Sequence, residues 1–416
     1  MSEASGSAGQ SLLGGDVVER LRSESAALTE PMVEFARKLV RTPSLPGREQ
    51  EAAQVMLAEM QALGFDEARI DSVGNAVGLV RATAPERTPK RILFNAHLDH
   101  VDVGDPARWP HPPYGGEVAD GYIWGRATSD LKGSIAAQVY ALALAKRAGL
   151  PLPNDLYVSG VVQEEIGGHG SDLLAEELPV DYVVIGEPSE NRLALGHRGR
   201  IEIRVKISGQ SVHASVPGAG VNPLYSLGRF LTALESLSFE PDPNHPALGP
   251  TTVAPTLLST DQTSPNVTPG EVTLVLDVRN TPGDSPDMVL SRVRELLGAS
   301  LLPGATGEAD IPIIRMVSYT GVARDYRVPS EPFGISPDHP LVTQAGDVLS
   351  VALGRPVERI YWRFATDAGH FAARGVHVIG FGPGAEEVIH TVNERISIDA
   401  MVEAMVCYAA LGISLR

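Results

Sequence analysis

Two different patterns of apolar and polar residues divide the chain. Strands that are apolar on both faces and separated by helices are typical of a mainly parallel sheet with helices on both sides. Between about residues 31 and 196 the chain shows this pattern, with apolar runs at 91–97, 155–163 and 181–186 and helical periodicity over 29–40, where Thr29 is the expected N-cap, and near 132–147. This region predicts an α/β unit.

The pattern changes near residue 200. In "IEIRVKIS" (201–208) and "EVTLVLDVR" (271–279), apolar residues alternate with polar ones, as in antiparallel strands with one wet face. Helical patterns at 222–237 and 286–298 are placed to cover the other face of such a sheet. A second, α+β unit with an antiparallel sheet is therefore expected.

After about residue 325 the first pattern resumes. It comprises a helix near 340–353, the buried run "VHVIGFG" (376–382) and a terminal helix near 399–412. We therefore expect the α+β domain to be inserted into a discontinuous α/β domain. The expected division is a flexible leader over 1–15, the first part of the α/β domain over 16–197, the inserted domain over 198–325 and the second part over 326–416.

Composition narrows the class of protein. The 416-residue chain is 43% hydrophobic and carries a formal net charge of −17, which argues against binding to nucleic acid or to an anionic membrane surface. Its single cysteine, Cys407, excludes an internal disulfide and suits a reducing compartment. No apolar stretch approaches the roughly 20 residues that cross a bilayer, and the N-terminus lacks the features of a signal peptide. A cytoplasmic protein is expected.

Acids and histidines gather where the predicted strands of the α/β unit end. His97 and Asp99 close the first strand, and the pair Glu164-Glu165 closes the second. Since functional groups of open parallel sheets lie at the carboxyl ends of the strands, these side chains are expected to converge. Three further residues follow the same rule: Asp130 before a helix, Glu187 after a third strand, and His390 after a glycine-rich loop.

Each of these residues also has a simpler interpretation when it is taken alone. A histidine at a strand end is more often a hydrogen-bonded structural residue than a ligand, Asp130 suits a helix cap, and the glutamates suit solvated turns. Their coincidence at one sheet edge favours a site instead. Two histidines and three or four carboxylates suit two divalent ions that share a carboxylate. Because neighbouring side chains diverge, one glutamate of the pair can bind metal while the other faces the substrate as a base.

The motifs around these residues resemble those of the M20 family of metallopeptidases and amidohydrolases, which includes acetylornithine deacetylase, succinyl-diaminopimelate desuccinylase, aminoacylase-1 and the glutamate carboxypeptidases. The resemblance covers nearly the whole chain from about residue 30. The motifs are "HLDHV" (97–101), "WGRATSDLKG" (124–133), "QEEIGGHGS" (163–171), "GEP" (186–188), "GQSVHASVPGAGVNP" (209–223), "NVTPGEVTLVLDVR" (266–279), "TDAGHF" (366–371) and "HTVNE" (390–394). The family's usual "GRGxxDMKG" reads "GRATSDLKG" here, so that Ala127 replaces a glycine.

The resemblance implies a dizinc hydrolase and a role for each residue. It implies that Asp130 bridges the two ions, that His97 and Glu187 complete one metal site, and that Glu165 and His390 complete the other. It further implies that Asp99 hydrogen-bonds the His97 imidazole and fixes its tautomer. Glu164 is implied as the general base that takes a proton from the attacking water.

The same resemblance implies that the inserted domain is a lid and dimerisation domain. His213 is implied to reach the active site of the partner subunit and to donate to the oxyanion there. Asn266 and Arg279 match positions that the family uses around the substrate, and Arg198 is a further candidate for a substrate carboxylate. Arg279 is equally compatible with a solvated strand arginine.

The expected function is hydrolysis of the amide bond of an N-acylated amino acid by a homodimer with two divalent ions. Zinc is the expected metal, although cobalt and manganese suit the same ligands. A dipeptidase or carboxypeptidase acting on small peptides would use the same chemistry. A non-catalytic binding module with this fold would have no need of Glu164. The segment 328–340 has no role that the resemblance assigns.

Overall fold

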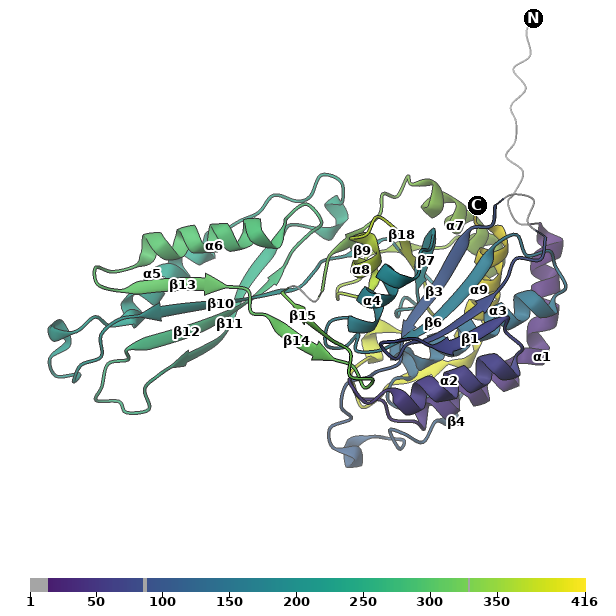
Figure 1. Cartoon of the computed structure of the whole chain (residues 1–416), viewed down its shortest axis with the longest axis horizontal. Coiled ribbons are helices and arrows are strands. Elements are labelled where there is room, and N and C mark those ends of the chain that lie inside the picture. Colours follow the sequence, from purple (N-terminus) through teal and green to yellow (C-terminus); the bar gives the residue numbers. More distant parts are fainter. Residues whose placement is uncertain (1–13, 85–87, 328–329) are drawn as a thin grey trace, which may run out of the picture.

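The computed structural model describes residues 14–84, 88–327 and 330–416. Of the leader expected over 1–15, residues 1–13 lie outside the described residues. Residues 328–329 of the segment 328–340 also lie outside them. Figure 1 shows two units joined side by side, the larger built on a long central sheet and the smaller on a separate antiparallel sheet. No helix in the described ranges combines the length and apolar character that a membrane span requires.

The larger unit contains an eight-stranded sheet with the order β1-β2-β6-β3-β7-β18-β8-β17. Its four central strands, β6, β3, β7 and β18, run parallel to one another, while β1 and β2 form an antiparallel edge. This arrangement confirms the predicted α/β class. The strands are β1 (Glu67–Ile70), β2 (Ala76–Val80), β3 (Arg91–His97), β6 (Asp155–Val161), β7 (Tyr182–Ile185), β8 (Leu193–Ala194), β17 (Arg359–Ile360) and β18 (His377–Gly380).

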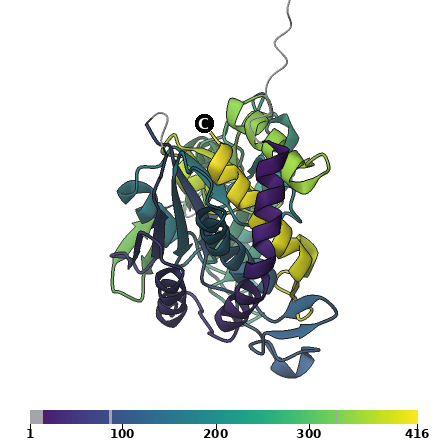
Figure 2. The same ribbon diagram turned by 90° about the vertical axis from the view of Figure 1, so that its right-hand side faces the viewer.

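Helices cover both faces of this sheet (Figures 1 and 2). Helix α3 packs against α1 and α9 on one face, and every residue from Gly133 to Ala145 is buried there. The crossover from β6 to β7 runs in the opposite direction from that between β3 and β6, so its helix α4 lies on the other face, beside α8. The helices are α1 (Gly15–Val40), α2 (Gln50–Ala62), α3 (Gly133–Arg147), α4 (His169–Glu177), α7 (Pro340–Leu353), α8 (Ala368–Ala372) and α9 (Ile398–Ser414).

The smaller unit has its own sheet and its own hydrophobic core. Strands β10 (Ile201–Ser208) and β12 (Glu271–Arg279) pair antiparallel, with Ile201 opposite Val278, and their alternate apolar residues are buried. Helices α5 (Pro223–Glu235) and α6 (Pro286–Ser300) supply the other side of this core. Strand β11 (Thr252–Thr260) forms one edge of the sheet and β13 (Thr306–Asp310) the other.

A hairpin of β14 (Ile314–Val317) and β15 (Ala323–Tyr326) leads the chain back to the larger unit. Its tip touches that unit, because the Tyr319 hydroxyl donates to the carbonyl of Gly74 at 2.9 Å. The remaining short elements are β4 (Glu117–Ala119), β5 (Tyr122–Trp124), β9 (Gly196–His197), β16 (Phe333–Gly334), β19 (Arg395–Ser397) and helical turns at Pro106–Arg108, Thr128–Lys132, Pro217–Ala219, Pro246–Leu248 and Glu386–Val388. The domain boundaries expected at 197/198 and 325/326 stay a prediction.

Candidate active site

Two groups of side chains that can hold metal ions meet at the carboxyl ends of the parallel strands. His97, Asp130 and Glu187 form one group, and Asp130, Glu165 and His390 form the other, with the ligand atoms of each group within 4.8 Å of one another. Asp130 belongs to both. Its Oδ1 lies 3.1 Å from Nε2 of His97, and its Oδ2 lies 3.0 Å from Nε2 of His390. The five residues expected as ligands are thus brought together, with Asp130 in the bridging position.

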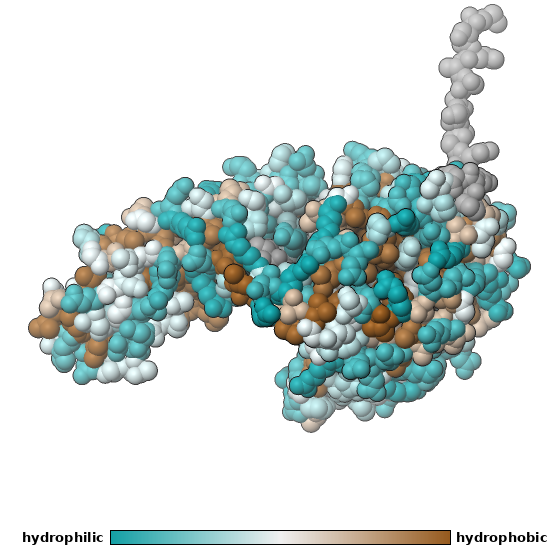
Figure 3. Space-filling view, viewed as in Figure 1, coloured by the Kyte–Doolittle hydropathy of each residue, from teal (hydrophilic) through white to brown (hydrophobic). Residues whose placement is uncertain are grey.

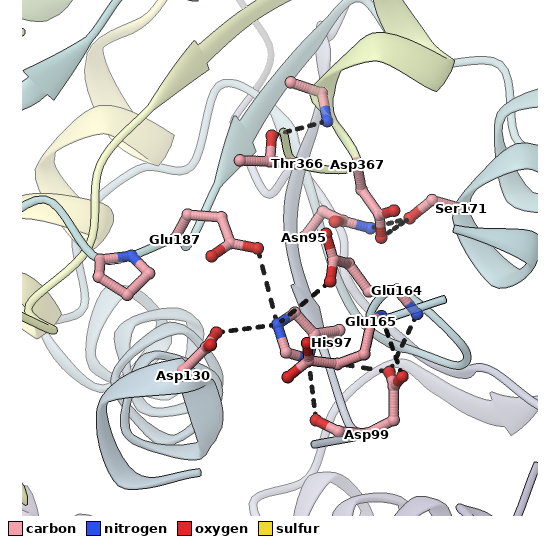
Figure 4. A network of polar contacts seen from close by, with 12 residues as sticks. Asn95, His97, Asp99, Asp130, Glu164, Glu165, Ser171, Glu187, Thr366 and Asp367 are labelled. Atoms are coloured by element: carbon pink, nitrogen blue, oxygen red, sulfur yellow. Dashed lines mark hydrogen bonds and ion pairs between the residues drawn. The ribbon is translucent and has the colours of Figure 1, made fainter. Parts of the chain in front are cut away.

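The fold explains this convergence. His97 is the last residue of β3, Glu187 follows β7 by two residues, and Glu165 lies in the loop after β6. Because these strands are parallel and adjacent, their ends lie at one edge (Figure 4). Nε2 of His97 lies 3.6 Å from Oε1 of Glu187, and Nε2 of His390 lies 3.3 Å from Oε2 of Glu165.

The chemistry of this cluster fits divalent cations. Glu187 and Asp130 are almost fully buried, and burial alone would raise the pKa of both carboxyl groups. Burial does raise that of Glu187, whereas hydrogen bonds from His390 and His97 lower the pKa of Asp130 overall. Oε1 of Glu165 is buried and has no hydrogen-bond donor among the described residues. Cations compensate buried carboxylates and an orphaned ligand oxygen of this kind.

Asp99 acts differently from the expectation. Nδ1 of His97 donates to the backbone carbonyl of Asp99 at 2.9 Å, whereas the Asp99 carboxylate lies 3.7 Å from that nitrogen. The carboxylate instead accepts the backbone N–H groups of Glu164 and Glu165, each at 3.1 Å. The predicted hydrogen bond between Asp99 and the His97 imidazole is therefore present, but the backbone carbonyl of Asp99 makes it and not the carboxylate. Asp99 fixes the His97 tautomer through its backbone and uses its side chain to hold the glutamate pair (Figure 4).

Glu394 is a functional candidate that the sequence interpretation missed. Its Oε1 accepts the backbone N–H groups of Ser129 and Asp130, both at 3.2 Å, so it holds the turn that presents the bridging carboxylate. Arg126 pairs with its other oxygen at 2.6 Å, and both side chains are buried. Burial raises the pKa of Glu394 to about 7. The motif "HTVNE" contained this signal, but only its histidine was interpreted.

Glu164 stands beside the ligand groups and faces a pocket. Its Oε2 lies 3.9 Å from Nε2 of His97. The charged residues that line the pocket, of about 250 Å³, are Glu164, Glu165, Glu202, Arg200, Arg279 and Arg327. It lies where the two units meet, because its lining comes from both. The space-filling view shows that the surface is indented between the two units (Figure 3). The larger unit thus contributes the acidic pair Glu164 and Glu165, whereas the smaller unit and the segment after it contribute the three arginines and Glu202.

The basic wall of the pocket contains a pair of arginines that share one aspartate. Nε of Arg200 lies 2.8 Å and Nε of Arg279 lies 2.7 Å from the two carboxylate oxygens of Asp277. Each guanidinium is thereby oriented through Nε while its terminal nitrogens stay available for an anion. Arg198, the other expected substrate residue, does not line this pocket and lies 3.4 Å from the Thr252 hydroxyl.

His213 and Asn266 lie apart from this cluster. Strand β10 begins beside the pocket and spans eight residues, which is about 26 Å at roughly 3.3 Å each, before the chain reaches His213. His213 is exposed and pairs with Val267, next to Asn266. The structure therefore places these two residues together, but not with the ligand groups of their own chain.

Comparison with known proteins identifies the family. A family model described as Peptidase family M20/M25/M40 matches residues 93–413. The chain belongs to this family. The uncharacterized protein YgeY of Escherichia coli (strain K12) is 30% identical over 402 residues, which is 96% of each chain. Succinyl-diaminopimelate desuccinylase of Phenylobacterium zucineum (strain HLK1) is 29% identical over 262 residues, which is 60% of this chain and 67% of that protein.

A solved structure supports the same fold. The aminopeptidase PepT from Bacillus cereus ATCC 10987 superposes with a TM-score of 0.74 at 20% identity, over 93% of this chain and 99% of that one. M20 proteins are hydrolases that act on amide bonds, and the family binds a dinuclear metal centre. The protein is thus an M20 metallohydrolase, as its motifs predict.

Proposed function

We propose that this M20 protein is a dinuclear-metal amidohydrolase that removes the acyl group from an N-acylated amino acid. The observation that carries the proposal is the position of Asp130, whose two oxygens face two separate ligand groups while Glu164 stands beside them, outside both groups. Hydrolysis needs a water that attacks and a group that moves its proton. Ions held by the two ligand groups would activate the water, and Glu164 would move its proton.

In this mechanism His97, Asp130 and Glu187 would hold one ion, and Asp130, Glu165 and His390 the other. When bound, the ions supply Lewis acidity and make a water available as hydroxide near neutral pH. Glu164 takes the proton of the attacking water on its carboxylate and passes it to the leaving amine nitrogen. Asp99 keeps Glu164 in place through the backbone of the loop.

Zinc is the ion we propose, with cobalt or manganese as substitutes for the same ligands. We also propose a cytoplasmic enzyme, because its one cysteine, Cys407, is free and buried, as suits a reducing compartment. Elemental analysis of the purified protein tests the metal, with two ions per protomer as the expected result.

A hydrolysis screen tests the reaction. The metal-loaded protein is offered N-acetyl and N-succinyl amino acids in parallel with dipeptides, and release of free amine is measured. Turnover of acyl-amino acids above dipeptides supports the proposal. Preference for dipeptides would assign the chain to the peptidase alternative, and bound metal with no hydrolysis of either class would favour a binding module.

The arginine pair is proposed to bind the substrate carboxylate. Changing Arg279 to Met removes charge-assisted hydrogen bonds worth about 1.5–3 kcal/mol, so KM is expected to rise roughly 10- to 100-fold with a smaller change in kcat. Arg198 serves as the comparison, because it lies outside the pocket. Initial-rate kinetics of Arg198→Met should stay within about twofold of the wild type. An equal rise in KM for both variants would contradict this assignment.

We propose that the enzyme works as a homodimer through the smaller unit. Strand β11 is an unpaired sheet edge among the described residues, and its Leu257 and Leu258 are 68% and 55% exposed. Tyr225 on α5 is 65% exposed. Exposed edge strands with apolar side chains invite pairing with another chain. The resemblance to the M20 family implies that His213 reaches the pocket of the partner in such a dimer.

Subunit mixing tests this arrangement. His213→Ala is expected to lower kcat roughly 10²- to 10³-fold by removing an oxyanion donor, with dimerisation and metal content unchanged. Inactive His213→Ala and Glu164→Gln subunits are then mixed. One site of the mixed dimer has its own Glu164 and the His213 of the other chain, so activity should return in part. Its absence after confirmed subunit exchange would show that His213 does not act across chains.

A further inference from the structure

The loop that carries Glu164 and Glu165 is held at its start by the β14–β15 hairpin. Gln163, the residue before the pair, is buried and has a left-handed backbone with φ of 62°. Its Nε2 donates to the carbonyl of Val317 at the end of β14, at 2.9 Å. A residue in this conformation keeps it only where its surroundings enforce it, and the hairpin is one of those surroundings.

The loop is held at its other end by His370 of α8. Nε2 of His370 lies 3.1 Å from the carbonyl oxygen of Gly167, which can only accept a hydrogen bond. Nδ1 of the same ring lies 3.7 Å from Oδ1 of Asp172 on α4. The sequence interpretation left His370 as a structural residue, and its ring sits between the loop and a buried aspartate.

Asp172 connects His370 to the same hairpin. Its Oδ2 accepts from Nη1 of Arg324 at 2.7 Å and from the hydroxyl of Tyr326 at 2.9 Å, and both residues belong to β15. Arg324 also grips Glu176 with both terminal nitrogens, at 2.7 and 2.8 Å. From hairpin to loop the residues thus lie in the order Arg324, Asp172, His370 and Gly167. The Asp172–His370 step is a 3.7 Å approach and not a hydrogen bond, and Arg374 also donates to Oδ1 of Asp172 at 2.7 Å.

The tip of the hairpin meets the loop by a third route. Tyr319 and Thr320 donate to the carbonyls of Gly74 and Ser72, at 2.9 and 2.8 Å. In the turn of the larger unit that contains Ser72 and Gly74, the Asn75 side chain accepts the N–H of Val162 at 3.0 Å and donates to the carbonyl of Gly170 at 3.0 Å. The hairpin thus contacts the larger unit at points that border both ends of the glutamate loop.

We propose that the β14–β15 hairpin is a brace that positions the Glu164–Glu165 loop, with Arg324, Asp172 and His370 as positioning residues. The proposal rests on the proposed function for the roles of Glu164 and Glu165 as base and metal ligand. The contacts between the hairpin and the loop do not depend on that function. The hairpin follows directly from the smaller unit, and Ile314 at its start lines the pocket (Figure 1). It therefore ties the pocket wall to the base and to one metal ligand. A shift of about 1 Å in such groups can cost 10²-fold in rate.

The test compares matched variants of the hairpin. Arg324→Ala cuts the path at its start, and His370→Ala cuts it at its end. Arg315→Ala is the control, because Arg315 lies on the same hairpin, is 65% exposed and pairs with Asp325 at 2.9 Å. Hydrogen–deuterium exchange follows the backbone of 162–170, and Zn²⁺ titration of the metal-free protein follows the affinity of the site. Neither measurement depends on the substrate.

Arg324→Ala and His370→Ala are each expected to speed exchange of 162–170 and to weaken Zn²⁺ binding roughly 10-fold, as for residues that orient metal ligands indirectly. Arg315→Ala should stay within about twofold of the wild type. With substrate, kcat should fall more than KM rises. His370→Gln keeps an N–H donor for the carbonyl of Gly167, so its exchange rate and Zn²⁺ affinity should lie close to those of the wild type. If His370 only filled space, this variant would show no such recovery relative to His370→Ala.

The double variant decides whether the two ends act together. If they belong to one path, Arg324→Ala with His370→Ala should cost no more than the larger single change. Additive losses, or exchange of 162–170 that stays at the wild-type rate, would overturn the proposal. If Arg324→Ala unfolds, Tyr326→Phe replaces it, since this change removes the hydroxyl that donates to Asp172. About twofold faster exchange of the loop is then expected. An unchanged loop in that variant would also overturn it.

Discussion

Removing the divalent ions is expected to abolish amide hydrolysis, with a loss of at least about 10³-fold in kcat. The attacking water and the polarised carbonyl both depend on Lewis acidity that is worth several kcal/mol, and each 1.36 kcal/mol is a tenfold change in rate. Glu164 can move a proton but cannot polarise a carbonyl, and a hydrogen bond from His213 to the oxyanion would supply only part of the stabilisation that the ions give. The measurement is turnover after dialysis against a chelator, with metal content determined by elemental analysis.

Variants of the ligand residues provide a comparison for the metal-removal experiment. Re-addition of Zn²⁺, Co²⁺ or Mn²⁺ should restore activity, since the oxygen and imidazole ligands accept all three. Asp130→Asn should weaken binding of both ions because Asp130 faces both groups, whereas Glu187→Gln should weaken binding of one. Circular dichroism of the stripped protein checks that the fold persists. Full turnover by protein shown to be metal-free would contradict the mechanism.

The parts of the fold that follow from periodicity could be predicted from the sequence. The strict alternation in 201–208 and 271–279 matches β10 and β12, because one face of that sheet is buried and the other is wet. The run 91–97, which is apolar on both faces at Ile92, Leu93 and Phe94, matches β3, which is buried from Ile92 onward. Parallel strands of this kind also explain why ligand candidates at strand ends converge in space.

Elements without such a pattern could not be predicted. Helix α1 begins at Gly15 and runs through Pro31, so Thr29 is not its N-cap, and its hydroxyl bonds to the carbonyl of Ser25 instead. Strand β11 is exposed along nearly its whole length and shows no alternation of burial. A strand shows an alternating apolar pattern when one of its faces packs against a hydrophobic core. An exposed edge strand such as β11 lacks that packing, so its sequence lacks the pattern.

The candidate site shows the same division. The chemistry of the ligand side chains can be interpreted directly from the sequence, and the resemblance to the M20 family assigns each of them to one of the two metal sites. The interpretation was incomplete where backbone groups decide the outcome. Asp99 bonds to His97 through its carbonyl while its carboxylate accepts two amide N–H groups, and Glu394 accepts the backbone N–H groups of the turn that contains Asp130. It named Arg198 but not Arg200, although Arg200 is the one of the two that lines the pocket, because which arginine reaches the pocket depends on where β10 begins beside the larger unit.

Changing Glu164 to Gln is expected to lower kcat roughly 10²- to 10⁴-fold while two ions stay bound. The amide keeps the size of the side chain and removes the group that accepts a proton. Burial, reinforced by the charge of Glu187, raises the pKa of Glu164 well above its usual range in the metal-free chain. A carboxylate with raised proton affinity is suited to take a proton from water and return it to an amine.

Glu165→Gln is the matched control, because it alters the neighbouring glutamate in the same loop. Glu165 lies in the ligand group with Asp130 and His390, so this variant should lose affinity for one ion, which metal titration detects. The pair therefore separates the two roles: Glu164→Gln retains metal and loses turnover, and Glu165→Gln loses metal first. If Glu164→Gln instead releases an ion while Glu165→Gln retains both, the base and the ligand have been exchanged. Near-normal kcat in metal-loaded Glu164→Gln would show that another group moves the proton.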